Sequence, residues 1–498
     1  MAKNPSSAPT YMGEIRKFFT DGDKDCMAGM GIDLSTYEGV KFNALRIYFK
    51  VRDGEMPLGG KRWSKERVET FYQWMKAGYQ RGKAAPRRPA AVRRTVDRFA
   101  RPPAKREDAA ALSGDQLEKL AEAFKHIMSL EDDDPNSYFT VAGMHWLPKP
   151  DVYCRHHENA YNPWHRLYMI RFEDALRSAP GCEKVTVPYW DITAPKIPDF
   201  LFEAPFDKYV FPRDLYNLKD KQMARKGDPT QRFDAKKILS NLKGYGVNDI
   251  IAGAMGQSHW EKFNGWDAGN THDGIISAHD AGHNSCGPTM QEQDIAAFDP
   301  IFWFFHSNWD RLWWDWQRSF GATTLDAFKS HLTGPSDWLD DPVLNGLPPF
   351  EQTSADTINL ADFDVSYGKP VQKPAKPAAQ ELFAASLPAH AAFELGAPGR
   401  VSVRAKNINR LHIPGSFDVV LEARGKEIAR KAIFQSSTPS QCATCRKKGV
   451  ANFDFDVPLA KLKGPVSVKI LLHRNGREVA FPLSQCGQPT INARLMLA

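Results

Sequence analysis

Cysteine is scarce in this sequence, and long apolar runs are missing from it. Seven cysteines in 498 residues cannot make the dense disulfide framework of a small secreted protein, and their low number fits a reducing compartment. No stretch of about 18 apolar residues occurs, so no membrane-spanning helix is expected. The first residues lack the apolar segment and cleavage site of a signal peptide, which favours a cytoplasmic location.

Histidine is absent from the first 125 residues and abundant after them. Eleven of the 14 histidines lie between positions 126 and 331. Surface histidines would be scattered along the whole chain. Neutral imidazole is the usual protein ligand of copper, zinc and iron, so the clustering predicts a metal site in this part of the chain.

Positive charge is concentrated in one segment. The chain has a formal charge of +7, and residues 81–106 alone carry ten Lys and Arg against one Asp. Because this segment is rich in Pro and Ala and poor in large apolar residues, it is expected to be a solvated linker. No groove-reading motif accompanies the charge, so nucleic-acid binding is not expected.

The apolar pattern divides the chain into three folded parts joined by two linkers. The histidine-rich part has helical spacing, with Ser113 as the expected N-cap of its first helix. The C-terminal part has alternating apolar residues and turn signals such as Asn475-Gly476, which favour a β-sandwich. The expected order is a helical accessory module (1–82), a basic linker (83–110), a catalytic domain (111–368), a second linker (369–390) and the β-domain (391–498).

Two segments place single histidines on apolar helix faces. In "PWHRLYMIRFEDAL", His165 shares a face with Met169 and Phe172, and in "DPIFWFFHSNWDRLWW", His306 shares one with Phe302. A buried imidazole needs hydrogen-bond partners or a metal ion. The sequence therefore predicts that both imidazoles point into the core.

A third segment, "ISAHDAGHNSCG", holds a histidine pair. His279 and His283 are four residues apart, adjacent on one helix face at a spacing of about 6 Å, and both could bind one ion. His156 precedes His165 by nine residues, on the opposite side if both were helical. We therefore expect His156 to reach the same centre from a loop.

Together these segments resemble the copper motifs of the type-3 copper family, which contains tyrosinases, catechol oxidases and hemocyanins. "YCRHHENAYNPWHRLYMIRFEDAL" is similar to the first copper signature, and "HDAGH", followed 23 residues later by the histidine of "DPIFWFFHSNWDRLW", is similar to the second. "VAGMHWLP" resembles the loop of the first ligand, and "VPYWDIT" resembles a further family element. The resemblance covers residues 111–365 and implies two copper ions, held by His145, His156 and His165 (copper A) and by His279, His283 and His306 (copper B).

The donor set agrees with this implication. Six imidazoles and no carboxylate suit copper in both oxidation states, whereas magnesium and manganese favour oxygen ligands. A three-histidine zinc site remains an alternative for either half alone. The resemblance further implies a mainly helical catalytic domain, in which a four-helix bundle holds the copper pair, and a C-terminal domain that shields its entrance.

The implied activity is that of a tyrosinase acting on small phenols. Such an enzyme uses O₂ to hydroxylate monophenols such as tyrosine at the ortho position and to oxidise o-diphenols such as L-DOPA to o-quinones, as in melanin formation. A catechol oxidase without useful monophenol hydroxylation is one alternative. A hemocyanin-like O₂ carrier is another, although a single copper unit without tandem repeats argues against a carrier.

The chain departs from the family pattern beside copper B. The residue after the first copper B histidine is often Asn, paired with an upstream Glu that holds a water; here it is Asp280, and Asn264 stands at the best candidate for the Glu position. We hypothesise that Asp280 acts as, or positions, the base for monophenols, the alternative being a helix-surface carboxylate. Phe302 resembles the phenylalanine that packs over the family's site, and Asn284 is expected to shape the substrate pocket.

Three cysteines are candidates for roles in the copper chemistry. Cys154 and His156, as Cys-x-His, resemble family members in which the sulfur is bonded to the histidine ring, and a free buried thiol is the alternative. Cys442 and Cys445 form a C-x-x-C that resembles a copper-transfer motif of fungal relatives.

Other residues around the motifs receive supporting roles. His157 is expected to point outward as a bystander, because its neighbour His156 points inward. Ligand imidazoles need hydrogen-bond partners that orient them. The candidates for this role are Asp191, Asn308 and Asp310.

Overall fold

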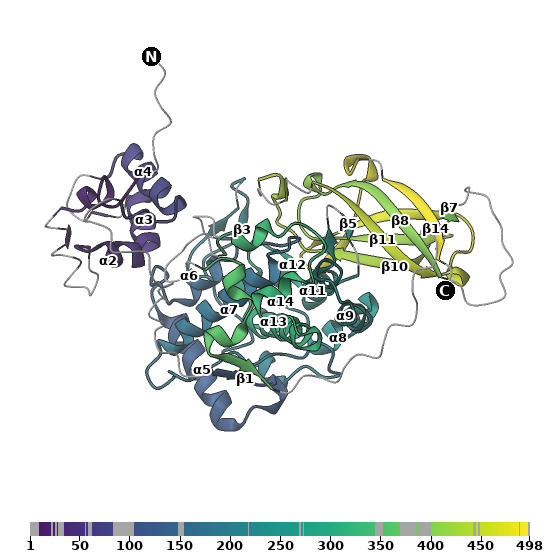
Figure 1. Ribbon diagram of the computed structural model, residues 1–498, viewed down its shortest axis with the longest axis horizontal. Coiled ribbons are helices and arrows are strands. Elements are labelled where there is room, and N and C mark those ends of the chain that lie inside the picture. Colours follow the sequence, from purple (N-terminus) through teal and green to yellow (C-terminus); the bar gives the residue numbers. More distant parts are fainter. Residues whose placement is uncertain are drawn as a thin grey trace, which may run out of the picture.

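The structure is a computed structural model with three successive parts: N-terminal helices, a large helical central part and a C-terminal part made of strands (Figure 1). Among the helices of the described residues, none is long and apolar enough to cross a membrane. The structure describes residues 9–20, 23–24, 27, 34–54, 56–57, 62–82, 104–147, 154–217, 219–267, 270–271, 273–343, 352–368, 385–386, 400–441, 445–446, 449–487 and 489–496.

The N-terminal part is helical and packs around aromatic rings. Trp74 is fully buried and contacts the rings of Phe71 and Tyr79. Lys50 reaches the central part through an ion pair with Asp133, with 2.6 Å between Nζ and Oδ2. The helices of this part are α2 (Tyr37–Phe42), α3 (Ala44–Arg52) and α4 (Lys65–Lys76).

The central part contains the longest helices of the described chain. As expected, Ser113 caps the first of them, and it shares a reciprocal capping box with Gln116. The helices are α5 (Gly114–Ser129), α6 (Tyr138–Gly143), α7 (Tyr161–Arg177), α8 (Ala235–Tyr245), α9 (Val247–Met255), α10 (Trp260–Asn264), α11 (Ile275–Cys286), α12 (Pro288–Gln291), α13 (Ile301–Phe320) and α14 (Leu325–Lys329). Short strands accompany them: β1 (Ala104–Arg106), β2 (Leu215–Tyr216), β3 (Gln222–Ala224), β4 (Trp266–Asp267), β5 (Asn270–Thr271) and β6 (Val365–Tyr367).

The end of the expected basic linker is part of the central fold. β1 pairs in parallel with β6, and Arg106 is fully buried, with its guanidinium bonded to Glu173 and Asp310. The expectation of a solvated linker was therefore wrong for residues 104–110, because three buried acceptors, including Tyr367, compensate the charge of Arg106. Residues 83–103 and most of the second linker lie outside the described residues.

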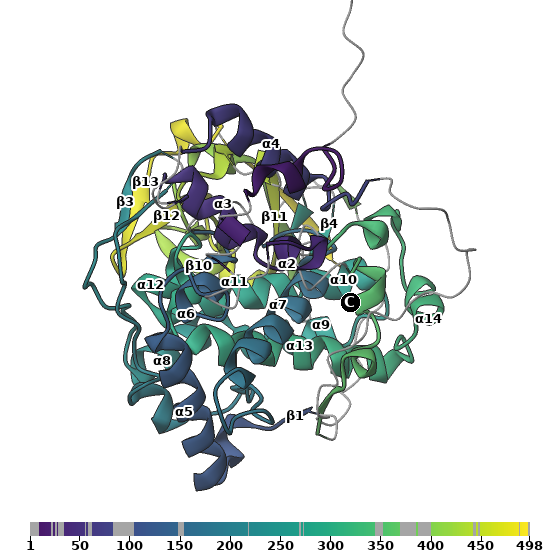
Figure 2. The same cartoon turned by 90° about the vertical axis from the view of Figure 1, so that its left-hand side faces the viewer.

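The expected sheet-containing C-terminal region is confirmed (Figures 1 and 2). Asn475 and Gly476 both have positive φ and form the tight turn between two paired strands, as their sequence predicted. A four-stranded sheet has the order β10-β9-β12-β13, and a six-stranded sheet the order β4-β5-β11-β8-β14-β7. The strands are β7 (Ala385–Ser386), β8 (Arg400–Asn409), β9 (Phe417–Ala423), β10 (Lys426–Ile433), β11 (Val450–Pro458), β12 (Val466–Arg474), β13 (Arg477–Phe481) and β14 (Thr490–Met496).

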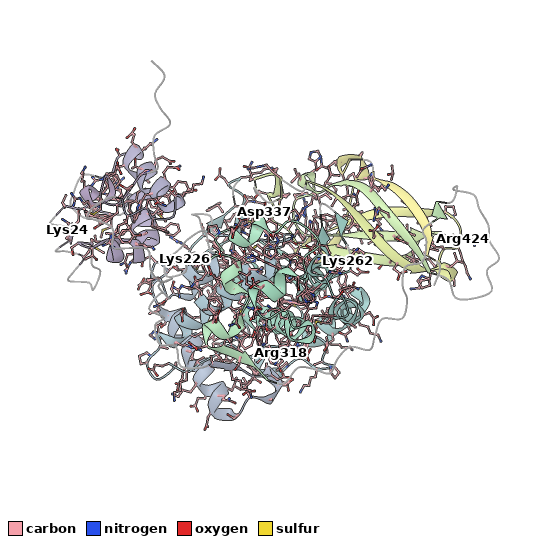
Figure 3. All side chains as sticks on the ribbon, viewed as in Figure 1. Lys24, Lys226, Lys262, Arg318, Asp337 and Arg424 are labelled. Carbon is pink, nitrogen blue, oxygen red and sulfur yellow. The ribbon has the colours of Figure 1, made fainter. Side chains whose placement is uncertain are left out.

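The central and C-terminal parts share a sheet. β4 and β5 belong to the central part, yet β5 pairs in parallel with β11, with Thr271 opposite Phe453. β10 packs against α11, the helix of the histidine pair. Figure 3 places Lys24 and Arg424 at opposite ends of the molecule, with the densely packed side chains of the central part between them. The C-terminal strands thus lie directly on the helices that carry the histidines.

Candidate dinuclear metal centre

Six histidines reach one buried region from five places in the chain. His145 lies in the turn after α6, and His156 lies in the loop before α7, as expected from its spacing. The helices α7, α11 and α13 carry the others. These are His165, His279, His283 and His306.

The histidines form two groups of three. His145, His156 and His165 make one group and His279, His283 and His306 the other, and in each group the ligand nitrogens lie within 4.8 Å of one another. The groups are adjacent, since the rings of His165 and His306 stack with centroids 4.4 Å apart and planes 8° apart. All six side chains are buried. The grouping is the one that the sequence motifs implied.

Backbone carbonyls orient three of the imidazoles. Nδ1 of His145 lies 3.2 Å from the Gln293 carbonyl oxygen, Nδ1 of His165 lies 2.8 Å from that of Tyr161, and Nδ1 of His283 lies 2.9 Å from that of Met290. An imidazole that donates from Nδ1 carries its lone pair on Nε2. The Nε2 atoms of these three histidines, and of His279 and His306, are buried without a hydrogen-bond partner.

The electrostatics favour neutral rings. Burial lowers the pKa of each of the six imidazoles, and neighbouring imidazoles lower most of them further. Burial alone lowers the pKa of His165 to about 3, although its hydrogen bond to Tyr161 opposes the shift. Neutral imidazole is the form that binds a metal ion.

These observations fit a pair of metal ions. Five buried nitrogens with free lone pairs would each cost free energy if nothing bound them, and a metal ion in each group removes that cost. Six imidazoles without a carboxylate among them match copper better than magnesium or manganese. The site defines a dinuclear metal protein with an all-histidine donor set.

Cys154 and Gln293 flank one ligand. Sγ of Cys154 lies 2.8 Å from Nδ1 of His156, and the amide nitrogen of Gln293 also lies 2.8 Å from that atom. Burial raises the pKa of the Cys154 thiol well above its ordinary range. The sulfur therefore lies against the ring to which the sequence resemblance would join it.

His157 is not the outward-pointing bystander that we expected. Its φ of 59° is left-handed and turns the side chain back into the protein, where it is 2% exposed and lies against the ring of Trp266. Nε2 of His157 is 2.7 Å from Oδ2 of Asp280. The adjacent histidines thus both point inward, one to the metal centre and one to Asp280.

Asp280 is buried rather than a helix-surface residue. Its carboxylate accepts hydrogen bonds from Nδ1 of His279 at 3.0 Å and from the backbone N–H of Phe434 at 3.0 Å. Burial raises the pKa of Asp280 well above its ordinary range, and the Phe434 amide and the charge of Arg410 oppose the rise only in part. Asp280 orients one ligand and contacts the C-terminal part.

Of the other residues expected near the centre, Phe302 contacts a ligand imidazole, whereas Asn264 and Asn284 bond to other groups. Phe302 is fully buried, with its ring 4.1 Å from that of His306. Asn264 is buried at the end of α10, and its Nδ2 donates to the carbonyl of Glu158 at 3.2 Å. Asn284 donates to Asp418 at 3.1 Å, so it meets the β-domain.

The three proposed orienting residues do not contact ligand imidazoles. Asp191 accepts from Thr193, and Asn308 accepts from Arg311. Asp310 accepts from Arg166, next to His165, with 2.6 Å between Nε and Oδ1. Asp310 therefore ties α13 to α7, while carbonyls and Asp280 hold the imidazoles.

Phe434 is a site residue that the sequence did not reveal. It follows β10, is fully buried, and its ring lies on that of His283 with centroids 3.8 Å apart and planes 10° apart. The same ring meets His156 edge-on at 5.1 Å and His279 at 5.9 Å. In sequence, Phe434 has the pattern of an ordinary core residue of a strand, and only the fold brings it to the histidines.

The C-x-x-C motif is described in part. Cys445 is buried and accepts a long contact of 3.7 Å from the Arg410 guanidinium. Cys442 lies outside the described residues.

Comparisons with known proteins agree with this centre. Residues 135–319 match the family model of the common central domain of tyrosinase. A tyrosinase from Hahella sp. (strain CCB-MM4) is 23% identical over 490 residues, which cover 72% of this chain and 88% of that protein. A G-type hemocyanin of Enteroctopus dofleini is 30% identical over 248 residues, covering 45% of this chain, but the match spans only 8% of the hemocyanin.

Solved structures share the fold. A tyrosinase from Burkholderia thailandensis superposes with a TM-score of 0.58 at 21% identity, covering 79% of this chain and 100% of its own. A functional unit of octopus hemocyanin gives 0.55 at 17% identity, covering 78% and 99%. With the matching central domain over residues 135–319 and both histidine groups, this part of the chain has the features of the type-3 copper family of tyrosinases and hemocyanins.

Proposed function

We propose that this protein is a tyrosinase, a copper-dependent oxidase of monophenols and o-diphenols, that its own C-terminal part keeps closed. The observation that carries the proposal is the position of Phe434, whose ring lies among the rings of His283, His156 and His279. A space that accepts one benzene ring against these imidazoles accepts the ring of a phenol after Phe434 leaves. The helices α5, α7, α11 and α13 would form the bundle around the copper pair.

The chain's own residues would bind and orient the substrate. When bound, the copper pair would supply O₂ activation and accept electrons from the phenol. His283 would offer its ring face to the substrate ring, as it does to Phe434. The Phe434 amide donates to Oδ2 of Asp280, the oxygen that also pairs with His157, so withdrawal of Phe434 would remove one of its two partners and let the phenol proton reach it.

Several contacts keep Phe434 in place. Residues 431–439 are all buried. Ser437 is bonded to Asp294 and Asn217, and Lys431 forms an ion pair with Asp273. Because these contacts flank Phe434 on both sides, the ring would leave only with the segment that carries it.

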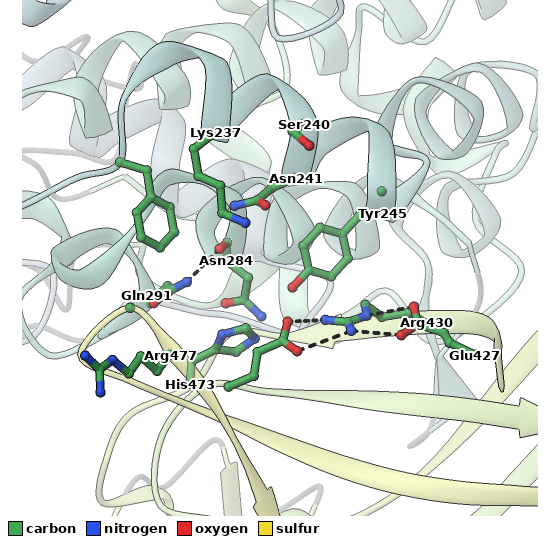
Figure 4. Close-up of a pocket in the computed structure, with 14 residues that line it drawn as sticks. Lys237, Ser240, Asn241, Tyr245, Asn284, Gln291, Glu427, Arg430, His473 and Arg477 are labelled. Carbon is green, nitrogen blue, oxygen red and sulfur yellow. Dashed lines mark hydrogen bonds and ion pairs between the residues drawn. The ribbon is translucent and has the colours of Figure 1, made fainter. Parts of the chain in front are cut away.

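A second set of contacts attaches the β-domain to the helices of the central part. Asp418 is fully buried and accepts hydrogen bonds from Tyr245 at 2.8 Å and Asn284 at 3.1 Å, both in the central part. Arg430 and His473 of its own domain balance its charge. Figure 4 shows Tyr245, Asn284, Arg430 and His473 around a cleft of about 520 Å³ between α8 and the strands.

One assay separates this proposal from its alternatives. The copper-loaded chain is given tyrosine and L-DOPA in separate reactions, before and after limited proteolysis between the central and C-terminal parts. A tyrosinase forms quinone from both substrates after cleavage and little before it. Quinone from L-DOPA alone favours a catechol oxidase, and reversible O₂ binding without quinone favours a carrier.

A further inference from the structure

We infer that Gln293 is a positioning residue that holds two of the three copper A ligands from a loop belonging to the copper B side. It is 2% exposed and follows α12, the short helix after α11. It lies far in sequence from both ligands that it contacts, His145 and His156. The inference rests on the copper centre described above and concerns how that centre is assembled.

The backbone of Gln293 acts on one ligand. Its carbonyl oxygen is the acceptor 3.2 Å from Nδ1 of His145. This hydrogen bond keeps the proton of His145 on Nδ1 and leaves Nε2 for the metal. A side-chain substitution at position 293 leaves this carbonyl in place.

The side chain of Gln293 acts on the other ligand. Its amide group lies 2.8 Å from Nδ1 of His156 and 3.3 Å from Sγ of Cys154. Metal binding through Nε2 places the proton of His156 on Nδ1, and the amide then presents its oxygen to that proton. A carboxamide can serve either tautomer by rotation, so Gln293 fits His156 both without and with metal.

The helix just before Gln293, α12, contacts a ligand of copper B. Nδ1 of His283 donates to the carbonyl of Met290, three residues before Gln293. Residues 290–293 therefore contact ligands of both groups. Asp294, the next residue, bonds Ser437 of the segment that carries Phe434. Residues 290–294 thus contact ligands of copper A, a ligand of copper B and the segment that carries Phe434.

This arrangement predicts that copper A depends on a side chain that copper B does not use. In Gln293→Leu, a buried ring N–H of His156 loses its acceptor, and copper A should bind about 10 to 100-fold more weakly, the range known for such orienting partners. Copper B keeps all its contacts. Gln293→Glu provides a permanent acceptor and should restore copper A to near its original affinity.

A matched control lies two residues away. Gln291 is 4% exposed, is the last residue of α12, and donates to the Asn284 carbonyl at 2.7 Å without touching a ligand. Gln291→Leu removes a buried amide of the same size. It should leave both copper affinities unchanged, which a general loosening of the loop would not do.

The experiment measures copper rather than turnover. Full-length wild type and the three variants are loaded with copper and titrated with a competing chelator, and the copper left on the protein is quantified. Anomalous diffraction at an intermediate chelator concentration shows which site has emptied. The inference predicts early loss from copper A in Gln293→Leu only, with recovery in Gln293→Glu.

Other outcomes overturn the inference. Equal loss from both sites, loss from copper B first, or the same loss in Gln291→Leu would make Gln293 a structural residue only. If Gln293→Leu does not fold, a Gln293→Glu protein with weakened copper A contradicts the inference by itself. The result is independent of phenol oxidation, since a protein that binds copper as predicted but oxidises no phenol refutes the proposed function alone.

Discussion

The rings of Phe434 and His283 lie face to face, with centroids 3.8 Å apart and planes 10° apart. One residue belongs to the C-terminal part and the other to the helix of copper B. Such a stacked contact adds about 0.5–1.5 kcal/mol beyond burial and occupies the space of an aromatic substrate. The state of this contact should therefore decide whether the centre is accessible.

Removing the Phe434 ring should open the centre without proteolysis. We expect uncleaved Phe434→Ala to oxidise L-DOPA at least about tenfold faster than the uncleaved wild type, because a substrate ring then no longer competes with a tethered ring. Phe434→Leu keeps much of the bulk and should be intermediate. Steady-state oxidation rates at matched copper content measure this. Equal rates for all three uncleaved proteins would show that Phe434 is not the barrier.

Loss of the Asp418 contacts should weaken the attachment of the β-domain to the central part. Asp418→Asn leaves Arg430 and His473 without their buried carboxylate and should cost about 3 kcal/mol in unfolding free energy. The uncleaved variant should also gain L-DOPA oxidation. Asp454→Asn breaks a partly exposed ion pair with Arg404 in the same domain and should cost at most about 1 kcal/mol. Denaturant unfolding measures both free energies. Equal losses in Asp418→Asn and Asp454→Asn would show that the Asp418 contacts do not hold the β-domain in place.

The His473–Asp418 pair should make stability depend on pH. Burial would lower the pKa of His473, but Asp418 outweighs burial, and the pKa lies above its ordinary value of 6.5. The folded protein therefore binds more protons than the unfolded chain just above pH 6.5, and this stabilisation is lost as pH rises through the raised pKa. The difference in melting temperature between wild type and His473→Gln should be largest below pH 6.5 and shrink in alkali. A constant difference would contradict the assignment.

Copper loading should join Cys154 to His156. Formation of the bond removes the thiol hydrogen and one ring hydrogen as two protons and two electrons, for which O₂ would be the oxidant. Intact-mass measurement should then show a protein lighter by one hydrogen molecule after loading in air, but not after loading without O₂. Cys154→Ser, which cannot form the bond, serves as the control. An unchanged mass in wild type would leave Cys154 a free thiol.

Asp280 should matter more for monophenols than for diphenols. In the Phe434→Ala background, we expect Asp280→Asn to lower kcat/KM for tyrosine about 100-fold through loss of the base, with a smaller effect on L-DOPA. The open background lets both substrates reach the centre, and it keeps the backbone N–H of residue 434 that donates to Asp280. Since Asp280 also orients His279, equal losses on both substrates would assign it that role alone.

The six histidines could be predicted because their chemistry is local in sequence. Helix spacing places His165, His279, His283 and His306 on helix faces that can share a centre, the nine-residue spacing to His165 puts His156 in a loop, and only His145 came from the family motif alone. The β-domain was likewise readable from alternation and from the Asn475-Gly476 turn.

The remaining site residues depend on tertiary contacts that no local pattern encodes. Phe434 and Gln293 reach the histidines from segments more than a hundred residues away from the copper A loop. His157 was predicted to point outward because its neighbour His156 points inward. Its left-handed backbone turns the side chain inward instead. Arg106 was assigned to a linker on the charge and the Pro/Ala-rich composition of its segment, while its buried partners, Glu173 and Asp310, come from distant helices.

The most direct test of the account is anomalous diffraction at the copper edge from crystals of the copper-loaded, full-length protein. We predict two copper peaks, one among His145, His156 and His165 and one among His279, His283 and His306, with the Phe434 ring beside them. A single peak, or copper bound away from these histidines, would contradict the dinuclear centre and the function built on it.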